Sequence, residues 1–491
     1  MVVQHNMQAA NANRMLNVTT GQQAKSTEKL SSGYRINRAA DDAAGLSISE
    51  KMRKQIRGLD KASSNAEDGV SSVQTAEGAL TEVHSMLQRM NELATQSANG
   101  TNSTTDRSAI QDEISQLTTE IDRVAETTKF NETYLLKGGD GTKQEYMKGH
   151  DAGLKGALTD GTTKATFKVA AGALDEGKSV TIGGKDYTIG SAVADVQTAV
   201  GKLNTAGDKV TVNDKTYTYV AANTAAPGGQ NVTTAGWVLD GDKTSVAGTT
   251  LTIANGDKVT TTPKNGASAS YTAAEMDNGV SKADPSIISA EKAVSLMKDE
   301  LIAANKVGVT NGTVTITGTP AYDKDNGVTF EINKGSAEVA NKLSFSLHVG
   351  SDADMTNKIT VGIETMNSSY LGIKGLNVND DSGIAGTYAI DAISDALQKV
   401  SDQRSSLGAV QNRLEHTIDN LDNVVENTTS AESRIRDTDM AKEMVNYSKN
   451  NILAQAGQSM LAQANQSNQG VLSLLQRSEE RRVGKECRSR W

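Results

Sequence analysis

Cysteine is almost absent from this chain of 491 residues, and its scarcity argues against two kinds of site. The single cysteine, Cys487, has no partner for a disulfide and no companion thiolates for a zinc site. The chain has five histidines: His5, His84, His150, His348 and His416. None lies in His-Glu-x-x-His or another clustered ligand spacing. We therefore expect no zinc hydrolase, no metal and no cofactor.

Aromatic residues are also scarce, and basic residues are outnumbered by acidic ones. Aromatics make up 3% and apolar residues 36% of the chain, both low for a large enzyme with one deep core. We therefore expect narrow cores, in the form of thin helical seams and small sheets. The net charge of −9 argues against nucleic acid as the main partner, because contacts with phosphates need a basic surface.

Long apolar runs are missing as well. No run approaches the roughly 18 residues that are needed to span a bilayer, so no membrane insertion is expected. The opening residues, MVVQHNMQAANANRML, lack a basic region followed by an apolar stretch and do not have the pattern of a secretory signal. If the protein leaves the cell, we expect a route that needs no cleaved signal.

Proline is confined to the middle of the chain, so both ends can form long uninterrupted helices. The four prolines are Pro227, Pro263, Pro285 and Pro320. Alternating spacings of three and four predict a long helix from Gly45 to Ser97, with Asp41 and Asp42 before its start. The seam of this helix contains Val73, Ala76, Leu80, Val83, Leu87, Met90 and Ala94. A shorter helix is expected over 109–126.

A second apolar ladder lies near the other end of the chain. Its members are Ile390, Ile393, Leu397, Val400, Leu407, Leu414, Ile418, Leu421 and Val425, with Arg404 and Gln411 as polar members. A helix over 45–97 would be a rod about 80 Å long, which cannot bury its seam alone. We expect the two ladders to pair in antiparallel fashion, with both termini at one end.

The region from about 138 to 386 has a different composition, rich in glycine, threonine, valine and aspartate. The segments VTIGGKDYTI (180–189) and VTVNDKTYTY (210–219) each read as two short strands around a Gly-Gly or Asn-Asp turn. LTIANGDKVTT (251–261) is a looser third copy. The fold class predicted is therefore α+β and multidomain, with a long antiparallel helical coiled-coil bundle from both chain ends and an inserted β-rich hairpin region of one or two small domains.

Motifs that could carry chemistry have simpler interpretations. GALDEGKS (172–179) fits the phosphate-loop pattern, but the sequence after it predicts a hairpin rather than the required helix. DKDNG (323–327) has its glycine one position early for a calcium loop, and we expect a hairpin turn. The carboxylate pairs Asp41/Asp42 and Asp437/Asp439 open helical stretches, where capping is the expected role. We predict that the protein is not an enzyme.

Long stretches at both ends resemble bacterial flagellin. They are KLSSGYRINRAADDAAGLSISEKMRKQIRGL (29–59), QTAEGALTEVHSMLQRMNELATQSANGTNS (74–103), LGAVQNRLEHTIDNL (407–421), AESRIRDTDMAKEM (431–444) and ILAQAGQSMLAQANQSNQGVLSLLQ (452–476). The resemblance covers about 1–140 and 340–476. Flagellins also carry a variable β-rich insertion between such ends. One departure is Asn468, where the family commonly has proline.

The resemblance implies a structural subunit that polymerises into the bacterial flagellar filament, outside the cell, for motility. It implies inner filament-core helices from 1–44 and 431–476, a rod domain from 45–140 and 341–430, and a variable insert over 141–340. The implied rod packing seam contains Val73, Leu80, Val83, Leu87, Met90, Leu397, Leu407, Leu414, Ile418 and Leu421. Because the end segments lack partners for every apolar face, we expect them to become ordered together with neighbouring subunits.

The resemblance also implies partners. They are other copies of the chain in a helical homopolymer, a flagellar export chaperone, and the filament cap and hook-junction proteins, with export through the flagellar type III apparatus. The implied polymerisation and chaperone-binding positions are Met440, Met444, Leu453, Met460 and Leu461. Recognition by Toll-like receptor 5 is implied through Gln88, Arg89, Leu93 and Glu113. A hook–filament junction protein and a surface adhesin that uses the β-rich insert stay open as alternatives.

The last stretch, RSEERRVGKECRSRW (477–491), departs from the rest in charge and composition. It can be back-translated into a sequence resembling a common short-read sequencing adapter, in frame. We therefore expect 477–491 to be a translation artefact, and exclude it from reasoning about the fold. A stop codon after the Gln476 codon in genomic DNA would support this hypothesis, and an open frame free of adapter would overturn it.

Overall fold

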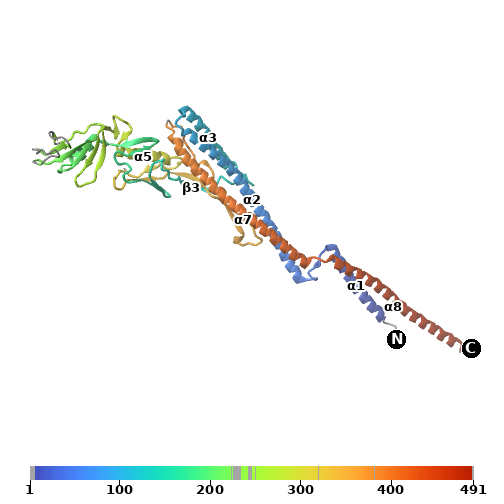
Figure 1. The fold of residues 1–491 in the computed structure, drawn as a ribbon. Coiled ribbons are helices and arrows are strands. Elements are labelled where there is room, and N and C mark those ends of the chain that lie inside the picture. Colours follow the sequence, from blue (N-terminus) through green and yellow to red (C-terminus); the bar gives the residue numbers. More distant parts are fainter. Residues whose placement is uncertain are drawn as a thin grey trace. The chain divides into compact units, whose positions relative to one another are not determined.

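A computed structural model of the chain describes residues 6–222, 224, 234–240, 246–248, 250–318, 320–380 and 382–488 (Figure 1). The chain forms two compact units. The first consists of Met1–Val70, Ser346–Ile359 and Asn412–Trp491, and the second of Ser71–Phe345 and Thr360–Gln411. Two long helices, α2 and α7, contribute residues to both units.

Long helices lie at both ends of the chain, and the strands lie between them together with the short helices α4 to α6. The helices are α1 (Met7–Ser32), α2 (Ala43–Ser97), α3 (Thr104–Thr127), α4 (Val193–Gly201), α5 (Ala290–Asn305), α6 (Ser368–Leu371), α7 (Ile384–Arg436) and α8 (Met440–Arg488), with a 3-10 turn η1 (Met355–Asn357). The strands are β1 (Lys129–Phe130), β2 (Thr133–Tyr134), β3 (Gly139–Tyr146), β4 (Ala157–Asp160), β5 (Lys164–Val169), β6 (Ser179–Ile182), β7 (Lys185–Ile189), β8 (Ser191–Ala192), β9 (Lys209–Val212), β10 (Lys215–Val220), β11 (Gly236–Leu239), β12 (Val246–Gly248), β13 (Lys258–Thr262), β14 (Ala269–Ala274), β15 (Met276–Asp277), β16 (Val280–Ser281), β17 (Ile287–Ile288), β18 (Thr315–Ile316), β19 (Val328–Asn333), β20 (Ser336–Asn341), β21 (Leu343–His348) and β22 (Lys358–Ile363).

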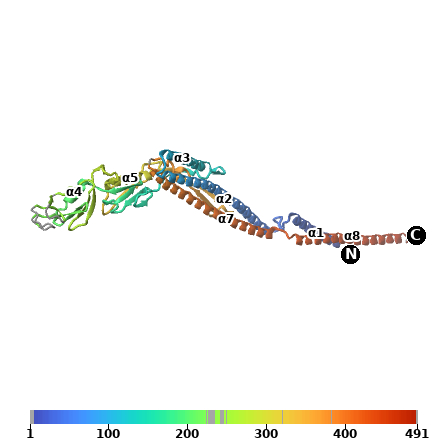
Figure 2. The same cartoon turned by 45° about the horizontal axis from the view of Figure 1, so that its top comes forward.

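In the first unit, α1 and α8 lie side by side and run in opposite directions (Figure 2). Near the start of α1, Asn6 Nδ2 donates to the carbonyl of Ala464 at 3.2 Å. Near its end, Ser26 donates to the carboxylate of Glu443, a hydrogen bond that is the main cause of the lowered pKa of Glu443. The start of α1 thus lies beside a later part of α8, and the end of α1 lies beside the start of α8, so the pair is antiparallel.

The parts of α2 and α7 in the first unit also pair in antiparallel fashion. Leu59 and Leu421 share a buried apolar cluster with Ala62 and Val425. Polar ties flank this cluster along the helices: Ser63 Oγ donates to Asp422 at 3.1 Å, and Ser49 Oγ donates to Glu432 at 2.6 Å. The predicted pairing of the two ladders is therefore confirmed at this level of the chain.

The hairpin segment 346–359 packs against α2 where α2 carries glycines. Asn65 Nδ2 donates to the carbonyl of His348 at 3.0 Å. A Cβ on Gly69 would lie 2.2 Å from Leu347 Cδ1, and one on Gly58 would lie 3.0 Å from the Cβ of Ser351. The two glycines therefore allow a closer approach of the hairpin than any other residue type would.

In the second unit, α2, α3 and α7 form the helical part. Arg404 on α7 reaches Glu77 on α2, with 3.3 Å between Nη2 and Oε1. The start of α3 is fixed by a capping box, in which the Ser103 side chain accepts from the amide of Asp106 and the Asp106 carboxylate accepts from the amide of Ser103. Ile110, Ile114 and Ile121 on α3 are buried. The expected second helix is thus present, and begins five residues before the expected start.

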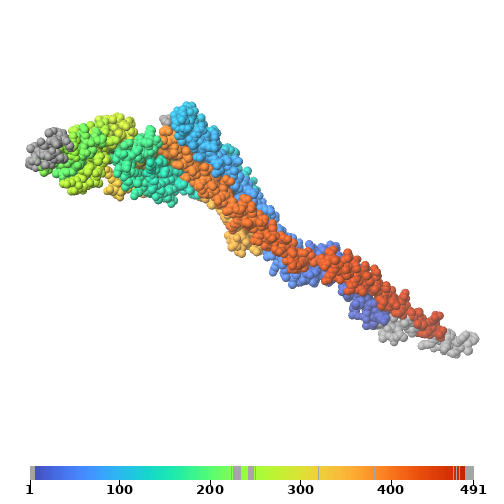
Figure 3. Space-filling model, viewed as in Figure 1, coloured from blue at the N-terminus to red at the C-terminus, as the bar shows by residue number. Residues whose placement is uncertain are grey.

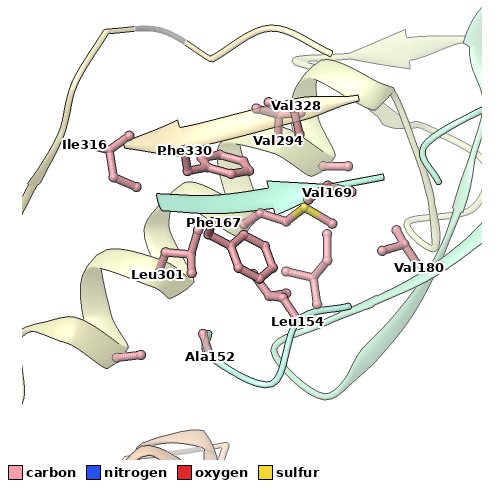
Figure 4. Close-up of a cluster of buried hydrophobic side chains, with 14 of the residues drawn as sticks. Ala152, Leu154, Phe167, Val169, Val180, Val294, Leu301, Ile316, Val328 and Phe330 are labelled. Atoms are coloured by element: carbon pink, nitrogen blue, oxygen red, sulfur yellow. The ribbon is translucent and has the colours of Figure 1, made fainter. Parts of the chain in front are cut away.

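The chain enters and leaves the insert through one antiparallel ribbon, in which β3 pairs with β20. Beyond it lies a first lobe built on a four-stranded sheet of order β18-β19-β5-β4 and a five-stranded sheet of order β15-β16-β17-β7-β6. Its core brings Phe167 of β5 and Phe330 of β19 together, with Leu301 and Val294 of α5 beside them (Figure 4). The two rings are 6.2 Å apart between centroids.

A second lobe contains a seven-stranded sheet of order β12-β11-β10-β9-β13-β14-β8. Val196 and Val200 of α4 pack on it in one buried cluster with Val210 and Trp237. Tyr219 meets the Trp237 ring edge-on, with 5.3 Å between centroids. Each of the two lobes therefore has a main buried cluster of its own.

The hairpin predictions had a mixed outcome. β6 and β7 pair around Gly183 and Gly184, and β9 and β10 pair around Asn213 and Asp214, which confirms two of them. All four turn residues have positive φ, as a type I′ turn requires. The third copy, 251–261, is wrong as a hairpin because 251–254 form no strand. Both edges of β13 are already occupied, by β9 on one side and β14 on the other.

Candidate assembly surfaces

The terminal helices α1 and α8, blue and red in Figure 3, expose a large share of their apolar side chains. In most of a folded subunit such side chains would be covered, but here many are about half to two thirds exposed. On α1 they are Met7, Met15 and Val18, and on α8 Met440, Met444, Val445, Ile452, Leu453, Met460 and Leu474. Of the α8 positions expected to act in assembly, four are exposed and Leu461 is half-buried.

One stretch of α8 is both apolar and hollowed. Met444, Val445, Ile452 and Leu453 line an open depression, with Ser448 and Lys449 between them. Ala454, on another side of the helix, is buried. The helix therefore uses one side to pack within the subunit and presents another, strongly apolar side to its surroundings.

The exposed positions on α1 were not predicted from the sequence. Met7, Met15 and Val18 are separated by eight and three residues, which places them near one stripe of a helix. The intervening residues are mostly Ala and Asn, so the apolar signal is weak. Their shared stripe is a signal that a helical periodicity analysis restricted to 7–32 would have had to detect against this background.

The predicted rod seam lies inside its helices. Val73, Leu80, Val83, Leu87 and Met90 of α2 are buried. Leu407, Leu414 and Leu421 of α7 are also buried, whereas Leu397 and Ile418 are half-buried. The eight buried side chains are consequently unavailable as contacts on the surface of the subunit and pack within it, whereas Leu397 and Ile418 keep part of their surface exposed.

The four positions at which the resemblance implied receptor recognition differ in how far their side chains are exposed. Gln88, Arg89 and Glu113 are exposed, but Leu93 is only 2% exposed, so its side chain offers almost no surface. Arg89 Nε lies 2.9 Å from Glu113 Oε1 on α3, and Arg89 Nη1 lies 3.2 Å from Glu92 Oε2. Hydrogen bonds to Glu113 and then Glu92 raise the pKa of Arg89. The sequence pattern alone did not distinguish the buried position from the exposed ones.

The two loop motifs have the structures expected of turns. GALDEGKS connects β5 to β6, so a strand follows it and no helix N-terminus is available for a phosphate. In DKDNG, Asp323 and Gly327 form an antiparallel bridge, and the Asp323 carboxylate accepts from the Asp325 amide at 3.0 Å and from Asn326 at 2.9 Å. Within the described residues, no group of three or more His, Cys, Asp or Glu side chains could hold a metal ion.

In each of the two carboxylate pairs, one residue caps a helix and the other does not. Asp42 caps α2 by accepting from the Gly45 amide at 2.8 Å, and Asp439 caps α8 by accepting from the Lys442 amide at 3.0 Å. Asp41 instead accepts from loop amides, first that of Arg38, and these bonds lower its pKa. Asp437 follows the end of α7. The capping prediction is therefore right for one residue of each pair and wrong for the other.

Comparisons with known proteins follow the same division into helical ends and a middle. The bacterial flagellin N-terminal helical region matches residues 3–140, and the bacterial flagellin C-terminal helical region matches residues 390–475. A flagellin of Clostridium tyrobutyricum is 40% identical over 479 residues, covering 96% of this chain and all of that protein. This chain belongs to the bacterial flagellin family.

Other flagellins agree with this assignment. Polar flagellin A of Vibrio parahaemolyticus is 34% identical over 478 residues, which cover 96% of this chain and 99% of that protein. The solved structure of FliC from Burkholderia pseudomallei is 20% identical and covers 70% of this chain and 99% of that one, with a TM-score of 0.27. A superposition at that level adds nothing to the assignment, which the sequence relatives carry.

Membership of the flagellin family describes a structural component of flagellar filaments rather than an enzyme. It agrees with a chain that places its apolar surface on long terminal helices. Among the described residues, no helix has the length and apolar character that crossing a membrane requires.

Proposed function

We propose that this flagellin polymerises into a flagellar filament outside the cell, and that the exposed apolar sides of α1 and α8 are buried between neighbouring subunits. Among the described residues of these two helices, ten large apolar side chains are exposed, and this observation carries the proposal. Full burial of one such side chain stabilises by roughly 1.5–3 kcal/mol, so covering the exposed half contributes about 1 kcal/mol for each. Several contacts of this size offset the entropy lost on association.

The proposal keeps the predicted division into an inner core (1–44 and 431–476), a rod (45–140 and 341–430) and an insert (141–340). The pairing of β3 with β20 supports the insert boundary, since both crossings of the chain lie in one ribbon there. The pairing of α1 with α8 supports an inner core made from both ends.

The test is seeded polymerisation of full-length protein, followed by pelleting and electron microscopy. Ile452→Glu places a charge in the apolar depression on α8, and we expect it to raise the concentration needed for filament growth at least tenfold. Gln458→Glu adds the same charge to an exposed polar position on the same helix and serves as the matched control. Equal filament growth by wild type and Ile452→Glu would refute the assigned surface.

Export is the second part of the proposal. We propose that the chain passes unfolded through the flagellar type III apparatus and that an export chaperone covers the apolar side of α8 beforehand. The exposed Met440, Met444, Leu453 and Met460 support this, since a chain with this surface uncovered would self-associate in the cell. Calorimetry with the flagellar chaperone and full-length protein should show binding that Met460→Glu weakens and Gln458→Glu leaves unchanged.

Recognition by Toll-like receptor 5 is the third part. Gln88, Arg89 and Glu113 are exposed and near one another on α2 and α3, which supports a surface at this level of the helices, with Leu93 as buried support. In receptor-reporter cells we expect Arg89→Ala to lose activity tenfold or more. Arg123→Ala is the matched control, because Arg123 also forms an exposed ion pair three residues away, with Glu120. Equal activity of both variants would refute this part.

A further inference from the structure

The segment 33–42, which connects α1 to α2, meets in the first unit the segment 435–439, which contains the end of α7 and leads into α8. Gly33 ends α1 in the left-handed conformation, with φ of +79°, and its amide donates to the carbonyl of Lys29 at 2.9 Å. Asp439 begins α8 by capping its first turn. Each connection therefore has only a few residues in which to fix the direction of its terminal helix.

Backbone hydrogen bonds cross between the two segments. Tyr34 and Asp437 form an antiparallel bridge. The amide of Arg35 donates to the carbonyl of Arg436 at 2.6 Å, and the amide of Thr438 donates to the carbonyl of Gly33 at 2.9 Å. Each segment thus supplies a donor that the other accepts, and the departure of either segment would leave groups on both without their partners.

Side chains cross as well. The guanidinium of Arg436 lies over the Tyr34 ring, with 4.8 Å from Cζ to the ring centroid. Its Nη1 is 3.1 Å from Glu50 Oε1 on α2, and the side chain is only 14% exposed. In the opposite direction, the Arg35 guanidinium donates to the carbonyl of Ile435. One arginine from each segment therefore fastens the other segment.

We propose that these contacts form a clamp through which α1 and α8 become ordered as one unit, so that neither terminal helix takes its position without the other. Arg436 is the positioning residue of this clamp, and Tyr34 is the surface on which it rests. The inference rests on the proposed assembly function, because the two helices that the clamp aligns are the surfaces through which subunits are proposed to associate.

The clamp explains why contacts between α1 and α8 do not have to carry the pairing alone. Many residues along the two helices are exposed, and among the side chains whose burial is described only Ser26 and Ala454 are buried. An antiparallel pair with so little buried surface gains from a fixed end, because fixing one end lowers the entropy lost when the rest pairs. The clamp supplies that fixed end, next to the better packed helices α2 and α7.

Hydrogen exchange followed by mass spectrometry tests the clamp in full-length protein, both as monomer and as filament. Tyr34→Ala removes the ring under the guanidinium, and Arg436→Lys keeps the charge near Glu50 but not the planar group. Tyr34→Phe keeps the ring and Arg434→Lys makes the same exchange at an exposed arginine of the same helix. These two are the matched controls. We expect the first two variants to raise exchange roughly fivefold in both α1 and α8, and the controls to leave it unchanged.

The result that overturns the proposal is a change confined to the altered segment's own helix. Unchanged exchange in both helices, or wild-type protein with neither helix protected in any state, overturns it equally. Failure of the proposed assembly function gives a different result, because wild-type protein would then form no filaments at all. The clamp would in that case be judged by the same four variants in the monomer.

Discussion

Replacing Gly69 by alanine tests the packing of the 346–359 hairpin against α2. A Cβ built at this position lies 2.2 Å from Leu347 Cδ1 and 3.3 Å from Leu414 Cδ1. Carbon atoms rest at about 3.5–4.0 Å, so Leu347 has to move by more than about 1 Å. Leu414 is buried, which leaves little room on the other side.

Two opposing effects set the magnitude. Alanine is about 0.8–1.0 kcal/mol more favourable than glycine in a helix interior, which stabilises the variant. Forcing an extra methyl into a packed site costs about 1–3 kcal/mol. Gly69→Ala should therefore be neutral or destabilising by up to about 2 kcal/mol. Gly78→Ala lies on the same helix with no atom within 4 Å of its Cβ, so it should stabilise by close to the full helix-propensity difference.

The assay is urea denaturation of the full-length monomer followed by far-ultraviolet circular dichroism. Gly78→Ala should raise the transition midpoint and Gly69→Ala should lower it or leave it in place. Adding Leu347→Ala to Gly69→Ala should cost less than Leu347→Ala costs in the wild-type background, because shortening the side chain at 347 also relieves the clash with the new Cβ at 69. If Gly69→Ala stabilises as much as Gly78→Ala, the close approach of the hairpin is refuted.

Three further predictions concern single side chains in the second unit. Ser103→Ala removes the cap of α3 and should destabilise by about 1 kcal/mol in denaturant titration, with no loss if the capping box is absent. Asn305→Leu should destabilise by about 1–3 kcal/mol, because buried Asn305 accepts from the His150 amide at 3.0 Å and donates to its carbonyl at 2.8 Å, and both would lose their partner; an unchanged midpoint would contradict this. Burial first, and then Glu364, raises the pKa of Tyr370 to about 12. The folded state therefore favours the neutral phenol, and the resulting stability is present below pH 10 and lost as pH rises towards 12. Tyr370→Phe should flatten this fall by about 1–2 kcal/mol after allowance for the partial exposure of the ring, and parallel pH profiles would refute it.

The helices at both ends of the chain could be predicted because the spacing of their apolar residues is a local pattern that repeats over many turns. Spacings of three and four over many turns predicted a helix from Gly45 to Ser97, and α2 runs from Ala43 to Ser97. The predicted ladder from Ile390 to Val425 lies within α7. Two hairpins were equally predictable, since Gly183-Gly184 and Asn213-Asp214 can adopt the positive φ that a tight turn needs. In each case a short stretch of sequence has one favourable backbone conformation.

Other features depended on contacts that no local pattern records. The amphipathic helix α5 lies inside a region whose glycine and threonine content predicted strands, and its buried side chains belong to the core of the first lobe. The segment 251–254 has strand composition, yet β13 had no free edge to offer it. Leu93 stands beside the predicted seam rather than on it, and it is buried because α3 returns along α2 at this level, where Arg89 meets Glu113.

The sequence by itself determined that the ends are long helices, that the middle is β-rich, and that the chain is a flagellin. These follow from periodicity, turn residues and long stretches of family resemblance, all of which can be read along the chain. The tertiary structure alone decided which apolar side chains stay exposed, because exposure depends on whether another segment covers the same face of a helix. Met444 and Leu414 are both apolar residues on long helices, yet Met444 is 55% exposed and Leu414 is fully buried. Leu414 is covered by neighbouring segments and Met444 is not, and only the tertiary fold determines which segments become neighbours.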